Sequence, residues 1–194
     1  MKYKLKDIVD AQFGLVLNRK EDKSMKSKIK YQILQSKSVR DNKIDLDNIS
    51  WFHSKEEIDD YYLTKVDDIL FKVTEPFDTV LIKENTSGLL VAANFIILRV
   101  SSSKVIPRFL LWYLGRPNIK NRIRLLTQGT SIIAIRTSDL LDLTINVPIL
   151  DKQKQIEEFL DLADKELNLL TDLLKHKENL YKQIPEKLLK NKKF

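Results

Sequence analysis

The sequence predicts an α+β fold, a mixed α/β domain followed by one long C-terminal helix of the coiled-coil type. Two patterns carry this prediction. Up to residue 148, short runs of β-branched and aromatic residues alternate with turn residues and with two segments that start at a proline. From Asp151 onward there is no glycine and one proline, while apolar residues recur every three or four positions. We therefore expect a domain over residues 1–148 and a helical segment over residues 149–194.

Strands are expected where β-branched and aromatic residues gather between turn residues. In the first part of the domain these segments are residues 31–37, 69–73, 79–83 and 89–99. Two further strands are expected over residues 132–135 and 143–147, with a helical turn over residues 137–141 between them.

Two helices are expected between these groups of strands. Pro107 can start the first, and residues 109–114 are apolar on nearly all sides, which predicts a buried helix that ends at Gly115. Pro117 can start the second, which is expected to close at Gly129 and is rich in basic residues.

The C-terminal helix is expected to span about 50 Å if it runs from Asp151, which can cap its start, to Ile184. Its apolar residues form a heptad seam that only Lys177 interrupts, and Pro185 is expected to kink or end the helix. We assign to dimerisation the seam residues Ile156, Leu160, Ala163, Leu167, Leu170, Leu174, Tyr181, Ile184 and Leu188. Five more apolar residues widen this face, namely Phe159, Leu162, Leu169, Leu173 and Leu180, so more than one helix is expected to pack on it. The alternative is a terminal helix that lies across its own domain.

Charge is distributed unevenly within the formal net charge of +7. Residues 41–84 hold twelve acidic and five basic residues, whereas residues 85–138 hold no carboxylate and eight basic residues. The eight are Arg99, Lys104, Arg108, Arg116, Lys120, Arg122, Arg124 and Arg136. Such a stretch favours contact with a polyanion, because each neutralised phosphate releases counterions and arginine adds two-pronged contacts. The alternative is that these cations balance the acidic segment within the fold.

The sequence shows no motif for catalysis. There is no cysteine, and His53 and His176 lie far apart without ligand spacing, so neither a metal site nor a catalytic residue is expected. The four glycines are too scattered for a phosphate-binding loop. A metal-dependent nuclease would need Asp10 and residues 21–23 on adjacent strands, but residues 21–30 look like a polar loop.

The chain also lacks an apolar run near the roughly 20 residues that span a bilayer, and its first residues open no signal peptide. We therefore expect a cytoplasmic protein that does not contact a membrane.

Several short motifs stand in a characteristic order, namely residues 5–8 with Gly14, then 67–71, 90–99, 107–110, 128–131 and 145–156. The most specific is the last, a strand followed by Pro148 and by the Gln-x-x-Ile of Gln153 to Ile156. Together they resemble half of a type I restriction-modification specificity subunit, the protein that tells a modification and restriction complex which DNA sequence to act on. Ile149 and Leu150 stand where that family commonly has a second proline, and the domain and helix occur once where it commonly has two copies.

The resemblance implies a target recognition domain that binds double-stranded DNA, and a spacer helix that serves dimerisation and methyltransferase docking. Two copies, or this chain and another half-subunit, would pair through antiparallel helices and read a palindromic site in two separated halves. The chain would be no enzyme and hold no cofactor, because S-adenosylmethionine and ATP would belong to the modification subunit and to a restriction subunit that joins later. The alternative is a regulatory half-subunit that acts mainly by protein–protein interaction.

DNA contacts are expected from two groups of residues, with cations on phosphates and a few side chains on base edges in the major groove. The first loop contributes Arg19, Lys20, Lys26, Lys28 and Lys30. The second group is Lys72, Lys83, Asn94, Gln128, Ser131 and Arg136. As alternatives, the first group is a solvated loop and Asn94 an ordinary strand residue.

Overall fold

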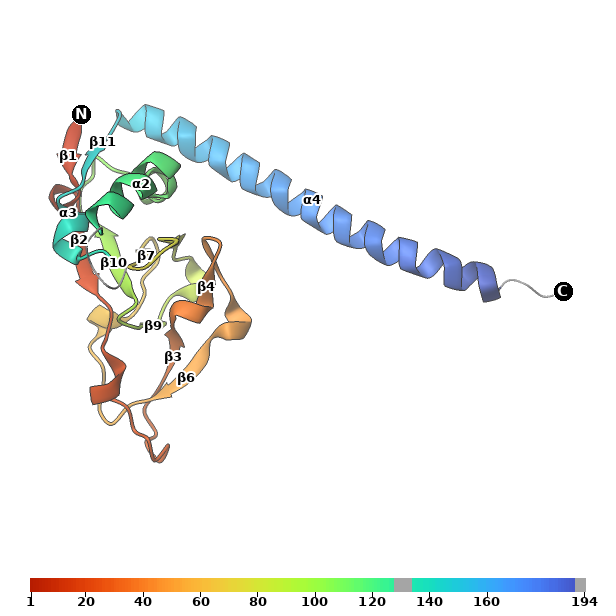
Figure 1. Cartoon of the computed structure of the whole chain (residues 1–194), viewed down its shortest axis with the longest axis horizontal. Coiled ribbons are helices and arrows are strands. Elements are labelled where there is room, and N and C mark those ends of the chain that lie inside the picture. Colours follow the sequence, from red (N-terminus) through yellow and green to blue (C-terminus); the bar gives the residue numbers. More distant parts are fainter. Residues whose placement is uncertain (128–133, 191–194) are drawn as a thin grey trace. The chain divides into compact units, whose positions relative to one another are not determined.

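The computed structural model describes residues 1–127 and 134–190, and the chain divides into two compact units (Figure 1). The first unit comprises residues 1–153 and the second residues 154–194. The first unit contains all the strands that the structure describes, and the second consists of most of the last helix. No helix of the described ranges is both long and apolar enough to cross a membrane.

A four-stranded antiparallel sheet forms the centre of the first unit. Its strands, in order across the sheet, are β2 (Val9–Phe13), β10 (Phe95–Val100), β7 (Ile69–Lys72) and β8 (Thr79–Leu81). The middle strands β7 and β10 bury side chains on both faces, which explains their nearly continuous apolar sequences. Leu70, Val80, Phe95 and Ile97 share one core cluster with Leu34.

A smaller sheet packs its own cluster beside this core. It consists of β6 (Ser50–His53), β3 (Lys30–Leu34) and β9 (Leu90–Val91), with β3 antiparallel to β6 and parallel to β9. Its inward side chains, including Ile33 and Phe52, pack against Leu15 and Ile58. Two further strand pairs are β1 (Lys2–Lys4) with β11 (Thr144–Asn146), and β4 (Val39–Arg40) with β5 (Lys43–Ile44). Short 3-10 helices cover Leu5–Asp7, Leu17–Arg19, Ser36–Ser38, Leu46–Asn48, Asp60–Tyr62 and Glu84–Thr86.

The helices of the first unit follow the sequence signals closely. Helix α1 covers Pro107–Gly115, as predicted, and buries Phe109 and Leu114 among other side chains. Helix α3 covers Thr137–Leu141, again as predicted. Helix α2 covers Pro117–Leu126 and ends three residues before Gly129, which lies outside the described residues. It stops early because both the backbone N–H and the side-chain hydroxyl of Thr127 donate to the Arg124 carbonyl.

The strands of the first unit differ more from the sequence-based expectations than its helices do. The single strand expected over residues 89–99 is two strands, β9 and β10, because the chain turns at Ala93 and Asn94 and the Phe95 N–H donates to the Ala92 carbonyl. The expected strand over residues 132–135 lies partly outside the described residues, although Ala134 pairs with Thr74. Strands β1, β2, β6 and the β4–β5 hairpin were not predicted.

Helix α4 (Leu150–Lys190) is 41 residues long, which corresponds to roughly 60 Å. It does not end at Pro185, so that part of the expectation is wrong. Proline removes only one backbone hydrogen bond, and near an exposed helix end water can satisfy the carbonyl that this frees. The expectation that Asp151 caps the start is also wrong, because the Ile149 carbonyl accepts the first helical bonds, from the N–H groups of Lys152 and Gln153. Asp151 lies in the first turn instead, where a negative charge favours the helix N-terminus.

Gln153 attaches this first turn to the rest of the first unit. Its side chain is fully buried, and its Oε1 accepts from the Ile106 N–H at 2.9 Å. Its Nε2 donates to the carbonyls of Lys104 and Pro148, both at 2.8 Å. The glutamine of the Gln-x-x-Ile motif therefore satisfies three backbone groups at once.

Gly14 lies where two backbones pass at close range, and replacing it with alanine is expected to lower the free energy of unfolding by about 3 kcal/mol. A Cβ at this position would stand 2.1 Å from the Ala92 carbonyl oxygen, so the backbone itself would have to move. Urea unfolding followed by circular dichroism measures the change. Gly115→Ala is the matched control, since its Cβ would meet only the Thr79 Oγ1, at 3.8 Å. Equal losses in the two variants would contradict the close approach.

Candidate nucleic-acid interface

The first predicted group of cations lies on an ordered loop that leads into β3. Asp22 organises this loop: its carboxylate accepts from the Ser24 hydroxyl at 2.6 Å, the Ser24 N–H at 3.0 Å and the Ser27 N–H at 2.7 Å. The Ser24 hydroxyl, followed by the Ser27 N–H, lowers the pKa of Asp22 below its usual value. Asp22 is thus engaged in holding the loop, and the described residues contain no group of three or more side chains suited to a metal ion.

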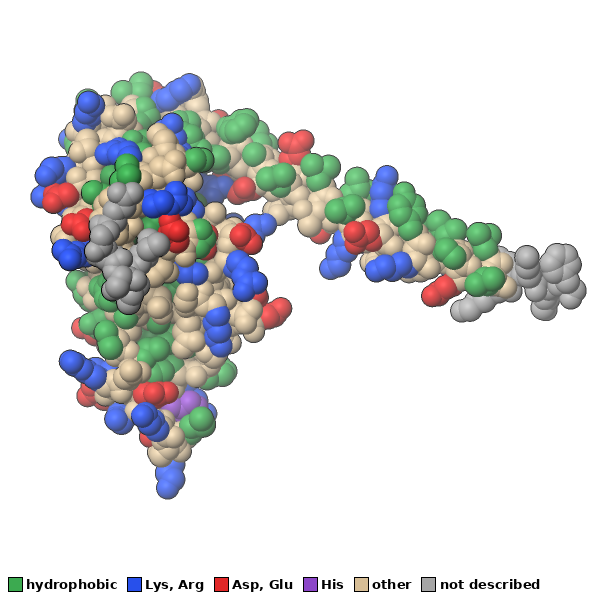
Figure 2. Space-filling view, viewed as in Figure 1, with side chains coloured by type: hydrophobic (Ala, Val, Ile, Leu, Met, Phe, Trp, Pro, Cys, Tyr) green, Lys and Arg blue, Asp and Glu red, His purple; other side chains and the backbone are tan. Residues whose placement is uncertain are grey.

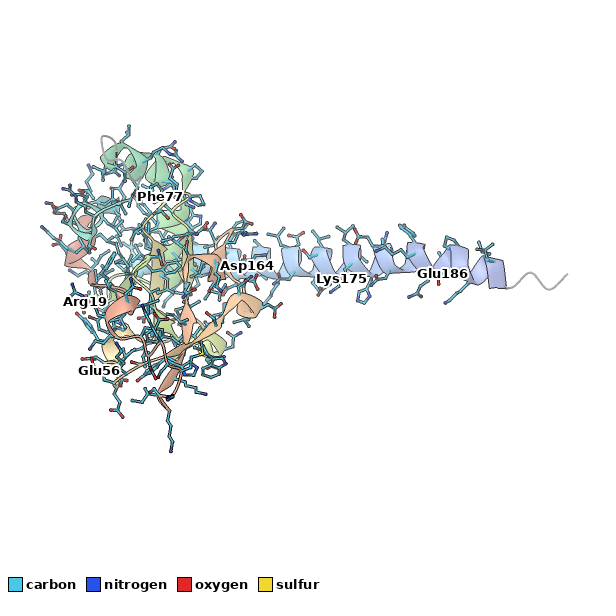
Figure 3. The ribbon with its side chains drawn as sticks, turned by 60° about the horizontal axis from the view of Figure 1, so that its bottom comes forward. Arg19, Glu56, Phe77, Asp164, Lys175 and Glu186 are labelled. Atoms are coloured by element: carbon cyan, nitrogen blue, oxygen red, sulfur yellow. The ribbon has the colours of Figure 1, made fainter. Side chains whose placement is uncertain are left out.

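The loop presents its cations at one end of the first unit, where Lys and Arg side chains gather at the bottom of Figure 2. Arg19, Lys26, Lys28 and Lys30 are exposed. Lys20 is half-buried and pairs with Glu56, and this hydrogen bond lowers the pKa of the Glu56 carboxyl. Figure 3 shows Arg19 and Glu56 on the same end of the unit. The structure therefore brings the whole first group together.

The second predicted group is divided between two ends of the central sheet. Lys72 and Asn94 lie close to Arg136, because Val73 bonds to the backbones of both Asn94 and Ile135. Lys83 follows β8 and lies at the other end of β7. Gln128 and Ser131 lie outside the described residues.

Within this second group the side chains differ in what they can do. Asn94, Lys83 and Arg136 are exposed. The Lys72 ammonium is instead turned toward the protein, where it donates to the carbonyls of Ser36 at 3.2 Å and Val39 at 3.4 Å. Lys72 therefore stabilises the turn before β4 and is a poor candidate for a phosphate contact.

Much of the acid-free stretch, residues 85–138, is used inside the fold. Arg99 pairs with Asp68, the Nε–Oδ1 distance being 3.0 Å, and Arg124 pairs with Glu75. Both carboxylates belong to the acidic segment 41–84, so the interpretation of internal charge balance accounts for these two cations. Lys120 donates to the Pro76 carbonyl at 3.0 Å, and burial lowers the pKa of its ammonium.

Two other arginines of this stretch also have partners in the first unit. Arg122 donates to the Thr144 carbonyl at 3.2 Å, and the Arg116 guanidinium lies 5.2 Å from the centre of the Trp112 ring. Five of the eight cations of the acid-free stretch therefore have partners within the first unit, whereas four of the five predicted first-loop cations are exposed.

Helix α4 carries the predicted dimerisation residues in an exposed row. Six of them have between 41% and 65% of their surface accessible: Leu167, Leu170, Leu174, Tyr181, Ile184 and Leu188. Ile156, Leu160 and Ala163 are half-buried. Another row, with seven-residue spacing, is entirely polar and consists of Glu158, Lys165, Asp172, Asn179 and Glu186. The side chains along the helix are visible in Figure 3, where Lys175 and Glu186 are labelled. The helix is thus amphipathic, and its apolar row is open to another helix.

Comparison with known proteins relates the whole arrangement to one family. The family described as "Type I restriction modification DNA specificity domain" matches residues 1–179. A curated relative from Methanocaldococcus jannaschii, named "Putative type I restriction enzyme MjaX specificity subunit", is 30% identical over 185 residues. The match covers 92% of this chain and 42% of the relative. The chain thus spans less than half the length of that relative.

Solved structures show the same fold at low sequence identity. The HsdS subunit of Thermoanaerobacter tengcongensis has a TM-score of 0.68 and 14% identity, with 95% of this chain and 47% of that chain covered. The type I restriction-modification S subunit of M. genitalium has a TM-score of 0.62 and 18% identity, with 100% and 46% covered. A third, from a study of complex assembly of the type I R-M system, has a TM-score of 0.68 and 17% identity, with 98% and 44% covered.

These matches confirm the α+β domain followed by a long helix, and they confirm the resemblance noted from the sequence motifs. The family description concerns DNA specificity and not a chemical reaction, in agreement with the expectation that the chain is not itself an enzyme. On the match over residues 1–179, this chain belongs to the type I restriction-modification DNA specificity domain family.

Proposed function

We propose that this chain is a DNA-reading part of a type I restriction-modification system, and that two copies pair through antiparallel α4 helices. The observation that carries the proposal is the apolar seam of α4, which repeats with a heptad period over more than four heptads and is exposed at its apolar positions from Leu167 to Leu188. A helix of this length with so much apolar surface in water is stabilised by packing against another helix.

The charge along α4 favours the antiparallel direction. Residues 151–170 contain six acidic and three basic residues, a net charge of −3. Residues 171–190 contain three acidic and five basic residues, a net charge of +2. Antiparallel pairing sets each negative half against a positive half, whereas parallel pairing sets like charges together. The charge therefore selects the direction of pairing, while the apolar seam supplies the stability.

One register places all ten seam positions, Lys177 included, opposite another seam position. The pairs are Ile156 with Leu188, Leu160 with Ile184, Ala163 with Tyr181, Leu167 with Lys177, and Leu170 with Leu174. The smallest seam residue thus faces the largest, and Lys177 can lay its aliphatic stem along Leu167 while its ammonium reaches water. The two-fold axis passes at the level of Asp172.

This pairing has a consequence for the DNA that is read. Each chain carries its domain before the N-terminal end of α4, so the antiparallel pair has one domain at each end, inverted relative to the other. The target is then a palindrome in two halves, and a helix of roughly 60 Å exceeds one turn of duplex, about 34 Å, so the bases between go unread. The first-loop cations of each domain hold the phosphates.

The apolar residues beside the seam provide a place for a further subunit. Phe159, Leu162, Leu169, Leu173 and Leu180 are all exposed, and a two-helix seam does not use them all. We assign this face to the modification subunit, which would bring the S-adenosylmethionine chemistry for adenine methylation, with a restriction subunit joining the complex later.

The proposal predicts a dimer that binds one duplex sequence with a steep salt dependence. Light scattering should give twice the 22.7 kDa of one chain. A duplex selected from a randomised pool should be bound by the dimer far more tightly than a scrambled duplex. With about 6–10 phosphate contacts, raising salt from about 50 to about 200 mM should weaken binding by roughly 10³- to 10⁵-fold.

Two results would count against the proposal. A stable monomer at micromolar concentration would contradict the proposed pairing of two chains through α4. A dimer without sequence preference or salt dependence, but with firm binding to a modification subunit, would favour the regulatory half-subunit instead.

A further inference from the structure

Strands β3 and β6 form a ribbon that is only two strands wide around Gln32 and Trp51. Lys30 lies opposite His53 and Gln32 opposite Trp51, whereas β9 joins the sheet only beside Ile33 and Leu34. In the part of the chain that the structure describes, no third strand pairs with residues 31–32 or 51–52, whereas Glu21 forms an antiparallel bridge with Ser54 just beyond the end of β6. A two-stranded antiparallel ribbon is one of the two kinds of backbone element that fit the major groove of B-form DNA.

The two faces of this ribbon differ sharply. On the inner face, Tyr31, Ile33 and Phe52 pack against the cluster around Leu15 and Ile58. On the outer face, Lys30, Gln32 and Trp51 are exposed, Trp51 to 63% of its surface. Single exposed apolar residues are common on proteins, but here a tryptophan stands directly across from a glutamine at the two-stranded part of a ribbon.

The cationic loop is attached to the ribbon next to this two-stranded part, at Ile29, His53 and Ser54. The Ser54 N–H donates to the Ile29 carbonyl at 3.0 Å, and the Asp22 N–H donates to the His53 carbonyl at 2.8 Å. Residues 19–30 contain six basic and two acidic residues, and Asp22 is already held by Ser24 and Ser27. Positive charge therefore flanks the outer face of the ribbon, which suits an anionic duplex rather than an apolar partner.

We propose that the β3–β6 ribbon enters the major groove and that Gln32 and Trp51 read bases there, while the first-loop lysines hold the adjacent phosphates. This inference rests on the proposed function, since it requires that the domain binds DNA. A glutamine amide can form two hydrogen bonds with adenine, one to N6 and one to N7, and an apolar side chain can contact the thymine methyl group. The pair of side chains is therefore suited to an A·T base pair or to two adjacent ones.

The test uses the full chain and two duplexes, one selected by the wild-type protein from a randomised pool and one scrambled. Gln32→Ala and Trp51→Ala are each expected to weaken binding to the selected duplex about 10-fold or more. Binding to the scrambled duplex and the slope of log K against log salt should stay the same. Lys26→Ala should weaken binding to both duplexes by the same factor, and it should reduce the magnitude of the slope of log K against log salt by about 1.

Leu125→Ala is the matched control, because Leu125 on α2 is exposed to the same 63% and lies outside the ribbon. It should change neither affinity nor slope, and urea unfolding should give the same midpoint for Trp51→Ala as for the wild type. Trp51→Phe serves as a second variant that keeps an aromatic side chain on the strand. Its preference for the selected over the scrambled duplex is expected to lie between those of the wild type and Trp51→Ala.

If the wild-type chain discriminates between the duplexes and both ribbon variants discriminate equally well, the inference is overturned while the proposed function stands. If the wild-type chain itself shows no preference for any duplex, the proposed function and this inference fail together.

Discussion

Replacing Asp68 with alanine is expected to lower the free energy of unfolding of the first unit by about 3 kcal/mol. Asp68 is 3% exposed, and its carboxylate accepts from the Arg99 Nε at 3.0 Å and the Lys65 N–H at 2.8 Å. The Arg99 guanidinium in turn donates to the Leu63 carbonyl at 2.9 Å, so this ion pair connects β10 to the segment before β7. Without Asp68, a largely buried guanidinium loses the carboxylate with which it pairs. Urea unfolding measures the loss.

Two further variants make this expectation specific. Asp142→Ala removes an exposed carboxylate that pairs with Lys4 and Lys6, and it should shift the unfolding midpoint far less, because solvent screens that pair. Asp68→Ala combined with Arg99→Met should be more stable than Asp68→Ala alone, since it removes the unpaired charge. If Asp68→Ala and Asp142→Ala lower the free energy of unfolding by the same amount, the Asp68–Arg99 pair does not have the stabilising role described above.

Glutamate at both Leu170 and Leu174 is expected to convert the proposed dimer into a monomer. In the antiparallel register these two residues face each other across the two-fold axis, so four carboxylates would meet at the centre of the seam. Burying unpaired charge in an apolar contact costs several kcal/mol, which corresponds to a loss of pairing affinity of at least about 1,000-fold. Sedimentation equilibrium measures the change in mass, and affinity for the selected duplex should fall with it.

The matched control adds the same two charges elsewhere on α4. Asn168→Glu with Asn179→Glu places them away from the seam, and this variant should remain a dimer. Lys177→Leu should pair more tightly than the wild type, because it fills the one polar position of the seam. Dissociation of the control to the same extent as the Leu170 and Leu174 variant would show that net charge, and not the seam, governs pairing.

The helices were the most predictable part of this fold because their limits are local. Pro107 and Gly115 bound α1, and Pro117 starts α2. The heptad period of α4 is likewise set by neighbours three and four residues apart. The end of α2 was missed because a threonine hydroxyl competes for a backbone carbonyl, which composition does not reveal.

Strands were less predictable because their partners are distant. Lys2–Lys4 forms β1 beside Thr144–Asn146, and one tyrosine between two lysines is too short a pattern to predict a strand. In β6, Trp51 and Phe52 are adjacent and both aromatic, so alternation cannot tell which faces the core. The structure buries Phe52 and exposes Trp51. Because the sequence alone does not show this, Trp51 was absent from the predicted DNA contacts.

The candidate interface was predictable as a set of charges but not as a set of roles. The lysines of the first loop and Lys72 look alike in the sequence. Only the folded chain shows that Lys72 donates to two carbonyls while Lys26 and Lys28 are exposed. Likewise, the absence of acidic residues between residues 85 and 138 favoured contact with an external polyanion. In the structure, however, Arg99 and Arg124 pair with carboxylates from an earlier segment.

Gln153 sets a limit on what can disturb the first turn of α4. Its amide carries no ionisable group, and all three of its partners are main-chain atoms. Acid, alkali and ionic strength therefore leave these bonds untouched, and so does any exchange of the Lys104 or Ile106 side chain that keeps the backbone path. Residues of the first loop can consequently change while the attachment of the first turn of α4 is preserved.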